Sequence, residues 1–404
     1  MKFKNTFLIV LACLFSLGSC QSQKNEQPKK TVQNKIIANN TIIVGANQTK
    51  QYLHLLDRKN IGIVANQTSV IFNENGFTHL VDSLNSLNIA IKKVFAPEHG
   101  FRGKADAGEH ITNGKDPKTG IDIISIYGKN KKPSNEHLLG LDLVVFDIQD
   151  VGARFYTYIS SLHYVMEACA ENNIPMLILD RPNPNGHYID GPILEDEHKS
   201  FVGMHPIPAV HGMTIGEYAQ MINGEKWLDN GVQCQLNIIK CVNYTKDKMY
   251  SLPIKPSPNL PNDVAINLYP SLCFFEGTNI SVGRGTEQQF QIFGAPFLNK
   301  TEFTFTPKPN DGAKHPKHEN SICYGADLSA HHKLNQLNLS WLIKAYNDSK
   351  NTNNKFWKPF FTKLAGTKHL QEQISNGLSE KDIRATWQNG LQEYDNMRQP
   401  YLLY

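Results

Sequence analysis

Four short runs of apolar, mostly β-branched residues in the first half of the chain set the strongest limit on its fold. They span residues 61–65, 89–95, 141–147 and 174–180, and polar residues follow each run. Short apolar runs of this kind are typical of strands that are buried on both faces of a parallel sheet. Residues 156–171 have helical spacing and lie between the last two runs. The sequence therefore predicts a Rossmann-like α/β domain with a mostly parallel sheet.

The pattern changes near residue 228. A strand-like segment at 232–242, a proline-stiffened loop at 253–261 and a mixture of short strands and helices follow. About 370 residues after the N-terminal tail are too many for one compact core. We therefore expect an α/β domain at 41–227 and a second, α+β domain at 228–404. Thr214 and Glu217 have the S/T-x-x-E spacing of a capping box, which predicts a helix start there and a structural role for Glu217.

The N-terminus has the pattern of a lipoprotein signal peptide. Lys2 and Lys4 precede a mostly apolar stretch at 6–19, which ends in Leu-Gly-Ser-Cys20. About 14 residues are too few for a membrane span, which needs roughly 20. We expect residues 1–19 to be removed and Cys20 to carry a lipid on the inner or outer membrane, facing the periplasm or the cell surface. Residues 20–40 form the expected flexible tether. Its polar part, roughly residues 21–35, is rich in Gln, Lys and Asn, and some 15 residues of this kind predict a reach on the order of 20 Å.

Charge and cysteine content narrow the classes of partner. Removal of residues 1–19 takes away two lysines and no acid, so the formal charge falls from +4 to +2. A nearly neutral chain is a poor partner for nucleic acid, and membrane contact then rests on the lipid alone. Five of the seven cysteines lie beyond the signal. Cys234 and Cys241 are near enough in sequence to form a disulfide, with buried free thiols as the alternative.

Several familiar site motifs are absent from the sequence. It has no G-x-G-x-x-G after a strand, no G-x-x-x-x-G-K-[ST] loop and no G-x-S-x-G elbow. The histidine pairs at 315 and 318 and at 331 and 332 have no third ligand at metal-binding spacing. We therefore expect no nucleotide, cofactor or metal.

Polar clusters follow the predicted strands, and in parallel sheets ligands bind beyond the carboxyl ends of the strands. Glu98, His99 and Arg102 follow the run at 89–95, in a loop stiffened by a proline and two glycines. A rigid loop of this kind suits a positioned general acid.

Asp150, Arg154, Tyr156 and Tyr158 follow the run at 141–147. Aromatic rings beside an arginine suit a sugar that carries a carboxylate. The alternative for Asp150 and Thr157 is that they serve the start of the following helix. Later in the chain, the Gly-Arg284-Gly sequence has the character of an anion-binding turn.

Six long motifs together resemble the NamZ-type peptidoglycan exo-β-N-acetylmuramidases, and the resemblance runs from about residue 43 to residue 404. They occupy residues 63–68, 96–103, 147–158, 180–184, 258–261 and 276–286. The resemblance implies a Rossmann-like domain joined to a second domain, with the active site in the cleft between them. It also implies release of N-acetylmuramic acid (MurNAc) from the non-reducing end of peptidoglycan fragments.

The resemblance also suggests roles for individual residues. Glu98 is the glutamate of the family's E-H-G motif and becomes the expected general acid. Asp150, Glu276 or Glu287 could activate water, or the acetamido group of the substrate could itself attack the sugar. Arg102, Arg154 or Arg284 would bind the lactyl carboxylate of MurNAc. The expected substrate-binding residues are Asn66, His99, Arg102, Gln149, Arg154, Tyr156, Tyr158, Asn259, Asn279 and Arg284.

Two other activities fit the same residues. An exo-lyase would release 1,6-anhydro-MurNAc instead of the free sugar. A lipoprotein that binds muropeptides without cleaving them would need the same recognition groups.

Overall fold

The structure is a computed structural model that describes residues 40–103, 109, 113–350, 352 and 354–404. The predicted signal peptide, Cys20 and the tether up to residue 39 lie outside the described residues. Residues Thr41–Tyr404 form one compact unit by their contacts. The predicted division of this part at residue 228 stays a prediction.

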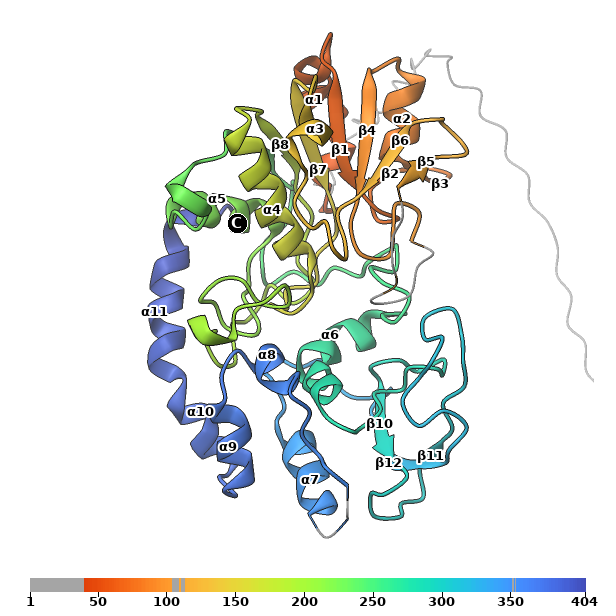
Figure 1. Ribbon diagram of the computed structural model, residues 1–404, viewed down its shortest axis with the longest axis vertical. Coiled ribbons are helices and arrows are strands. Elements are labelled where there is room, and N and C mark those ends of the chain that lie inside the picture. The colour runs from red at the N-terminus through yellow and green to blue at the C-terminus, as the bar shows by residue number, and fades with distance from the viewer. Residues whose placement is uncertain (1–39, 104–108, 110–112, 351, 353) are drawn as a thin grey trace, which may run out of the picture. The chain divides into compact units, whose positions relative to one another are not determined.

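A seven-stranded sheet organises the first half of this unit, with strand order β5-β6-β4-β1-β7-β8-β9 (Figure 1). All pairs are parallel except β5 with β6. The four predicted strands are present in it, and the expected α/β sheet is confirmed. The strands are β1 (Ile61–Ala65), β4 (Ile91–Ala96), β5 (Gly114–Lys115), β6 (Asp122–Ser125), β7 (Leu143–Asp147), β8 (Met176–Leu179) and β9 (Leu236–Ile239).

Both faces of the sheet are buried, which explains the continuous apolar runs. Side chains alternate along β7, so that Val144 and Phe146 join one core and Leu143 and Val145 join the other. Helices α1 (Thr49–Leu56) and α2 (Leu80–Ser86) contribute to the second core. The first core contains residues of α3 (Asn135–Leu138), α4 (Tyr158–Glu171) and α5 (Ile215–Gly224). The sheet is thus the middle layer between two sets of helices.

Two smaller sheets accompany the seven-stranded sheet, one in each half of the unit, and the second half is otherwise mainly helical. The strands β10 (Ile292–Ala295), β12 (Cys323–Asp327) and β11 (Thr304–Phe305) form one, and the hairpin β2 (Val70–Asn73) with β3 (Gly76–His79) forms the other. The remaining helices are η1 (Gly45–Asn47), η2 (Asp196–His198), η3 (Asp229–Gly231), α6 (Asp263–Leu272), η4 (Cys273–Gly277), α7 (Ser340–Ser349), α8 (Phe361–Ala365), α9 (His369–Ser375), α10 (Glu380–Thr386), α11 (Gln388–Arg398) and η5 (Gln399–Tyr401).

Cys234 and Cys241 do not form a disulfide. Both thiols are buried and free, as are those of Cys169, Cys273 and Cys323. The alternative of buried free thiols is therefore the correct one. Among the described residues, none of the helices combines the length and the apolar character needed to span a bilayer.

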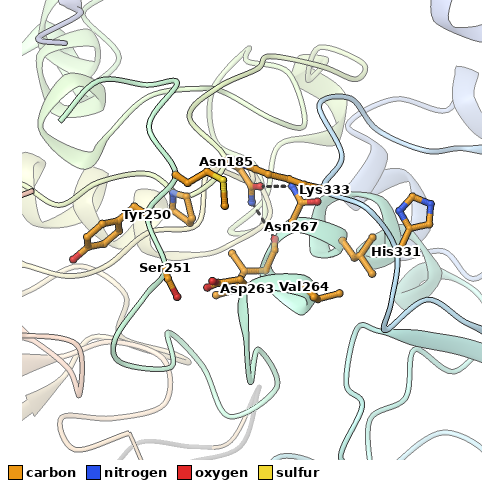
Figure 2. A pocket seen from close by; sticks show the side chains of 12 residues that line it. Asn185, Tyr250, Ser251, Asp263, Val264, Asn267, His331 and Lys333 are labelled. Atoms are coloured by element: carbon orange, nitrogen blue, oxygen red, sulfur yellow. Dashed lines mark hydrogen bonds between the residues drawn. The ribbon is translucent and has the colours of Figure 1, made fainter. Parts of the chain in front are cut away.

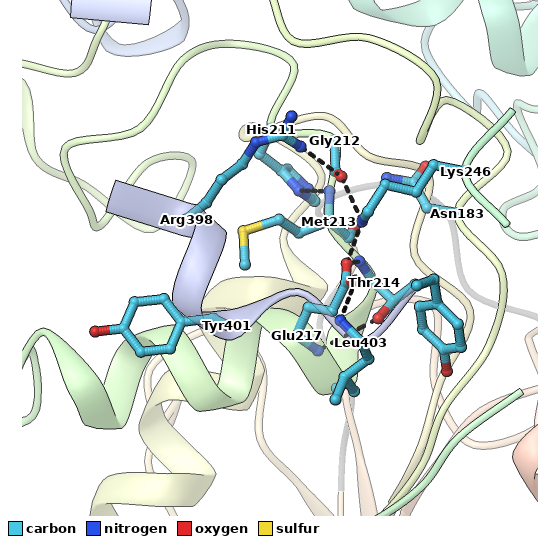
Figure 3. Close-up of polar contacts among 12 residues, drawn as sticks. Asn183, His211, Gly212, Met213, Thr214, Glu217, Lys246, Arg398, Tyr401 and Leu403 are labelled. Atoms are coloured by element: carbon cyan, nitrogen blue, oxygen red, sulfur yellow. Dashed lines mark hydrogen bonds and ion pairs between the residues drawn. The ribbon is translucent and has the colours of Figure 1, made fainter. Parts of the chain in front are cut away.

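The C-terminal segment is tied to the start of α5 (Figure 3). Thr214 and Glu217 form the predicted capping box. The carboxylate of Glu217 also pairs with the ammonium group of Lys246 and accepts a hydrogen bond from the backbone amide of Leu403 at 2.8 Å. Arg398 donates to the carbonyl of Gly212 at 3.1 Å. The end of the chain therefore helps to fix a helix that packs on the sheet.

Asp180 lies directly after β8 and is fully buried. Its carboxyl accepts hydrogen bonds from the Thr214 hydroxyl at 2.7 Å and the Tyr404 hydroxyl at 2.8 Å. Burial nevertheless raises the pKa of Asp180 to about 6, although these hydrogen bonds favour the charged form. The folded protein therefore holds this proton more tightly than the unfolded chain does.

Asp180→Asn should change how stability depends on pH. Because the folded-state pKa lies above the ordinary value, the contribution of Asp180 to stability falls as the pH rises from about 4 to about 6. The loss sums to about 3 kcal/mol. The free energy of unfolding is measured with urea at a series of pH values. Between pH 4 and pH 7, the value for the variant should rise by about 3 kcal/mol relative to the value for the native protein.

The unfolding free energies of the native protein and of Asp180→Asn are compared at each pH. A difference between them that does not change with pH would contradict a raised pKa at Asp180.

Candidate active site

A cavity of about 330 Å³ contains two of the four carboxylates that the sequence suggested for catalysis. Glu98 comes from the loop after β4, and Glu276 comes from η4 in the second half of the chain. Aromatic and apolar side chains form most of the rest of the wall, together with a few polar ones and one arginine. The lining residues are Glu98, His99, Tyr127, Phe155, Tyr156, Thr157, Phe201, Val202, Ser257, Leu260, Tyr269, Cys273, Glu276, Arg284, Phe290, Phe360 and Leu364.

The carboxyl of Glu98 is hydrogen-bonded at both oxygens. Tyr127 donates its hydroxyl to Oε1 at 3.0 Å, and Thr157 donates its hydroxyl to Oε2 at 2.6 Å. The backbone carbonyl of Glu98 accepts from the Tyr158 hydroxyl at 3.4 Å. The next residue, His99, has a φ of 67°, a left-handed conformation that is unfavourable for a side chain of this size. Hydrogen bonds from residues after β6 and at the start of α4 thus hold Glu98 in place.

Glu276 forms an ion pair with Arg284, and both side chains line the cavity. The Arg284 Nε donates to Glu276 Oε2 at 3.1 Å, and the guanidinium lies 5.2 Å from the centroid of the Phe290 ring. Burial raises the pKa of Glu276, but the charges of Arg284 and Lys317 outweigh this effect and hold the pKa below its usual value. Glu276 is therefore a charged carboxylate at neutral pH.

Lys317 fixes the turn that carries Glu276. Its ammonium group donates to the carbonyls of Phe275, Thr278 and Ile280 at 2.9–3.0 Å. Burial lowers the pKa of Lys317 to about 8, with the Glu276 charge acting in the opposite direction. The Lys317 ammonium group therefore stabilises the backbone around η4 and also favours the ionised form of the Glu276 carboxylate.

Two of the three candidate arginines have other partners. The guanidinium of Arg102 forms ion pairs with Asp82 at 3.1 Å and Asp116 at 2.7 Å. Arg154 is fully buried and donates to the carbonyls of Pro192, Ile207, Leu364 and Ala365. These contacts join segments far apart in the sequence, and neither arginine lines the cavity. Their placement does not support the expected contact with a substrate carboxylate.

Two predicted catalytic carboxylates also lie outside the cavity wall. Asp150 is buried, and its Oδ2 accepts from the amide of Gly152 at 2.6 Å and lies 3.3 Å from His211 Nε2. The Asp150 carboxyl therefore supports the turn at Gly152 and not the start of α4 at Tyr158, which was the alternative role predicted for it. Glu287 is exposed and is absent from the wall.

Tyr156 and His99 line the cavity as expected, whereas four other predicted binding residues hold loops in place. The Tyr156 hydroxyl donates to the Pro256 carbonyl at 2.7 Å, so that its ring forms part of the wall. The side-chain amides of the other four form hydrogen bonds with backbone groups or with a neighbouring side chain. These residues are Asn66, Gln149, Asn259 and Asn279.

Tyr127 and Phe201 belong to the wall but carried no signal in the sequence. Tyr127 follows β6, a strand of only four residues. Phe201 lies at the tip of a small hairpin closed by hydrogen bonds between Ser200 and Gly203, and its ring packs 6.0 Å from that of Tyr127. Only the order of strands in the sheet, which places β6 beside β4, could have connected Tyr127 with Glu98.

A second cavity, of about 310 Å³, differs in chemistry (Figure 2). It lies between the start of α6 and the loops around Met249 and His331. Its buried amides are already paired, since Asn267 donates to Asn185 at 3.1 Å and to the Leu334 carbonyl at 3.1 Å. Asp263 is the single acid among its lining residues. A pair of carboxylates is therefore found in the cavity of Glu98 and not in this one.

Ligand-type side chains for a metal ion approach one another at one place in the described part of the chain. Glu195, Glu197 and His198 lie at and just before the turn η2, and the Glu197 side chain is 62% exposed. None of the three lines the cavity of Glu98. The chemistry of that cavity rests on carboxylates, hydroxyls, an arginine and aromatic rings.

Comparison with known proteins gives close matches over almost the whole chain. Residues 61–264 match the family described as exo-β-N-acetylmuramidase NamZ, N-terminal, and residues 267–404 match its C-terminal counterpart. The peptidoglycan β-N-acetylmuramidase NamZ of Bacillus subtilis (strain 168) is 36% identical, over 99% of this chain and 98% of that protein.

Two crystal structures of DUF1343 family proteins from Bacteroides fragilis NCTC 9343 have the same fold. The first is 46% identical with a TM-score of 0.82, and the second is 27% identical with a TM-score of 0.76. Each match covers 90% of this chain and 99% of the other. The two family matches, the relative and the shared fold lead to one conclusion: the chain belongs to the NamZ family of exo-β-N-acetylmuramidases.

Proposed function

We propose that this protein is a glycoside hydrolase that releases MurNAc from the non-reducing end of peptidoglycan fragments, using the cavity of Glu98. The observation that carries the proposal is the presence of two carboxylates, Glu98 and Glu276, in the wall of one cavity. Glycoside cleavage typically uses two carboxylates in different protonation states. The match to the B. subtilis peptidoglycan β-N-acetylmuramidase supports the choice of substrate.

Glu98 takes the role of general acid and protonates the oxygen that leaves with the next sugar. Glu276 is unsuited to that role, because Arg284 and Lys317 hold its pKa low and keep it charged. A fixed negative charge instead stabilises the positive charge that develops on the sugar ring in the transition state. Aromatic residues such as Tyr156 and Phe201 offer apolar surfaces for the sugar.

Arg284 is the arginine that suits the lactyl carboxylate of MurNAc. Its Nε already bonds Glu276, while the two terminal nitrogens have no side-chain partner among the described residues. A guanidinium offers two donors in the right geometry for a carboxylate. Arg102, by contrast, is paired with two aspartates, and Arg154 donates its hydrogen bonds to backbone carbonyls.

Glu98→Gln should keep the fold and lower turnover by a factor on the order of 10² to 10⁴, because the amide cannot donate an acidic proton. The substrate is a disaccharide with MurNAc at its non-reducing end. Product masses separate the three activities. Free MurNAc identifies a hydrolase, and a sugar lighter by one water identifies a lyase. An intact disaccharide that raises the melting temperature of the protein identifies a binder.

The exposed Glu74 provides the matched control, and Glu74→Gln should turn over the disaccharide at the native rate. Native turnover by Glu98→Gln would rule out the assignment of the general acid.

We also propose that the protein is an exported lipoprotein anchored through Cys20. The apolar stretch that ends in Leu-Gly-Ser-Cys20, followed by a polar segment, supports this proposal. A tether of some 15 residues and on the order of 20 Å suits an enzyme that meets wall fragments near a membrane surface. Such a location fits a role in cell-wall degradation or recycling.

Cys20→Ser should abolish the attachment. The native protein expressed in a Gram-negative host should sediment with membranes and incorporate a labelled fatty acid, and the variant should do neither. The free Cys234 supplies a control, since Cys234→Ser should leave the labelling unchanged. Equal labelling of Cys20→Ser would contradict the proposed anchor.

A further inference from the structure

Three elements meet at the carboxyl of Glu98, and two of them present a hydroxyl group to it. Tyr127 lies just beyond β6, and Thr157 directly precedes α4. Their oxygens lie 3.0 Å from Oε1 and 2.6 Å from Oε2 respectively. Each oxygen of the carboxyl therefore has a hydroxyl partner, and the two partners come from opposite sides of β4 and β1 in the sheet.

Thr157 is at the N-cap position of α4 but does not act as a cap. Side chains at this position usually accept a hydrogen bond from a backbone amide two or three residues later. The Thr157 side chain makes no such bond, and its hydroxyl is directed to Glu98. A purely helix-stabilising role therefore does not account for this hydroxyl.

Hydroxyl groups suit a carboxyl that must gain and lose a proton. A lysine or a backbone amide can only donate, so it favours the carboxylate alone. A hydroxyl donates to the carboxylate and can rotate to accept from the carboxylic acid. A general acid passes through both states in each turnover.

We propose that Tyr127 and Thr157 are positioning residues that hold the Glu98 carboxyl in place in both of its protonation states. The inference rests on the proposed function, because it takes Glu98 as the general acid. Tyr158 adds to the same arrangement through the Glu98 backbone carbonyl. The ring of Tyr127 is itself held against Phe201, which keeps its hydroxyl in place.

Other groups around Glu98 can affect its titration and are the same in every variant below. Tyr158 and Tyr269 stay neutral over the working range, because burial raises the pKa of each well above its usual value and nearby charges, including that of Glu98, raise it further. The remaining titratable or charged groups in the described part of the cavity wall are His99, Tyr156, Cys273, Glu276 and Arg284.

The test is the pH profile of kcat/KM for Tyr127→Phe and Thr157→Val with the MurNAc-terminated disaccharide. Removal of one hydroxyl takes a hydrogen bond from both protonation states but leaves the shape of the wall. Because the bond to the carboxylate is charge-assisted and therefore the stronger one, the charged form is destabilised more than the acid. The limb of the profile that reports the loss of the Glu98 proton should therefore shift to higher pH, by about one unit, in each variant. Thr157→Ser restores a hydroxyl and should return the limb to its native place.

Tyr164→Phe is the matched control. Tyr164 stacks on Phe201 with ring centroids 6.2 Å apart but does not line the cavity. This variant should keep the native profile, so a change of packing alone would not imitate the expected result.

Three outcomes overturn the inference, and each has a separate meaning. If Glu98→Gln is inactive but neither hydroxyl variant moves a limb of the profile, the positioning role is wrong and the proposed function stands. If Glu98→Gln is fully active, the assignment of the general acid fails, and the positioning role fails with it. A limb that moves in Thr157→Val and stays moved in Thr157→Ser also counts against a role of the hydroxyl.

Discussion

The parallel pairing of β4, β6, β1 and β7 is the constraint on which the candidate active site depends. Because these strands run in the same direction, their carboxyl ends meet at one edge of the sheet. Glu98 follows β4, Tyr127 follows β6, and Thr157 lies in the connection from β7 to α4. The central strands β1 and β7 are buried along their whole length, and the last three residues of β4 are buried as well, so the packing that stabilises the domain also helps to fix the distances among these side chains.

The sequence predicted this edge well, because buried strands and the polar residues after them leave a clear pattern. Glu98 and Tyr156 were found in this way. The pattern does not show in which direction a side chain points. Arg154 lies in a motif full of polar residues, yet its guanidinium points inward to four carbonyls. Tyr127 was missed because β6 is short and half exposed, and because its position beside β4 depends on the topology of the sheet.

The second half of the chain supplies the charges that complement Glu98. Glu276 and Arg284 pair with each other, and Lys317 lies behind them with its ammonium group bound to the carbonyls of the same turn. The sequence indicated a polar, anion-binding turn here but could not show that it faces the loop after β4. The two carboxylates of the cavity therefore have different surroundings. Glu98 accepts hydrogen bonds from hydroxyl groups, and Glu276 is kept ionised by Arg284 and Lys317. That difference is what acid-assisted cleavage of a glycosidic bond requires.

A crystal structure of Glu98→Gln with a bound MurNAc-terminated disaccharide would test the account most directly. The account predicts that the sugar lies in the cavity between residue 98 and Glu276. The linking oxygen should lie within hydrogen-bonding distance of the residue 98 amide, and the lactyl carboxylate should lie within hydrogen-bonding distance of the terminal nitrogens of Arg284. A sugar bound in the cavity beside Asn185 and Asn267, or a lactyl group turned away from Arg284, would contradict it.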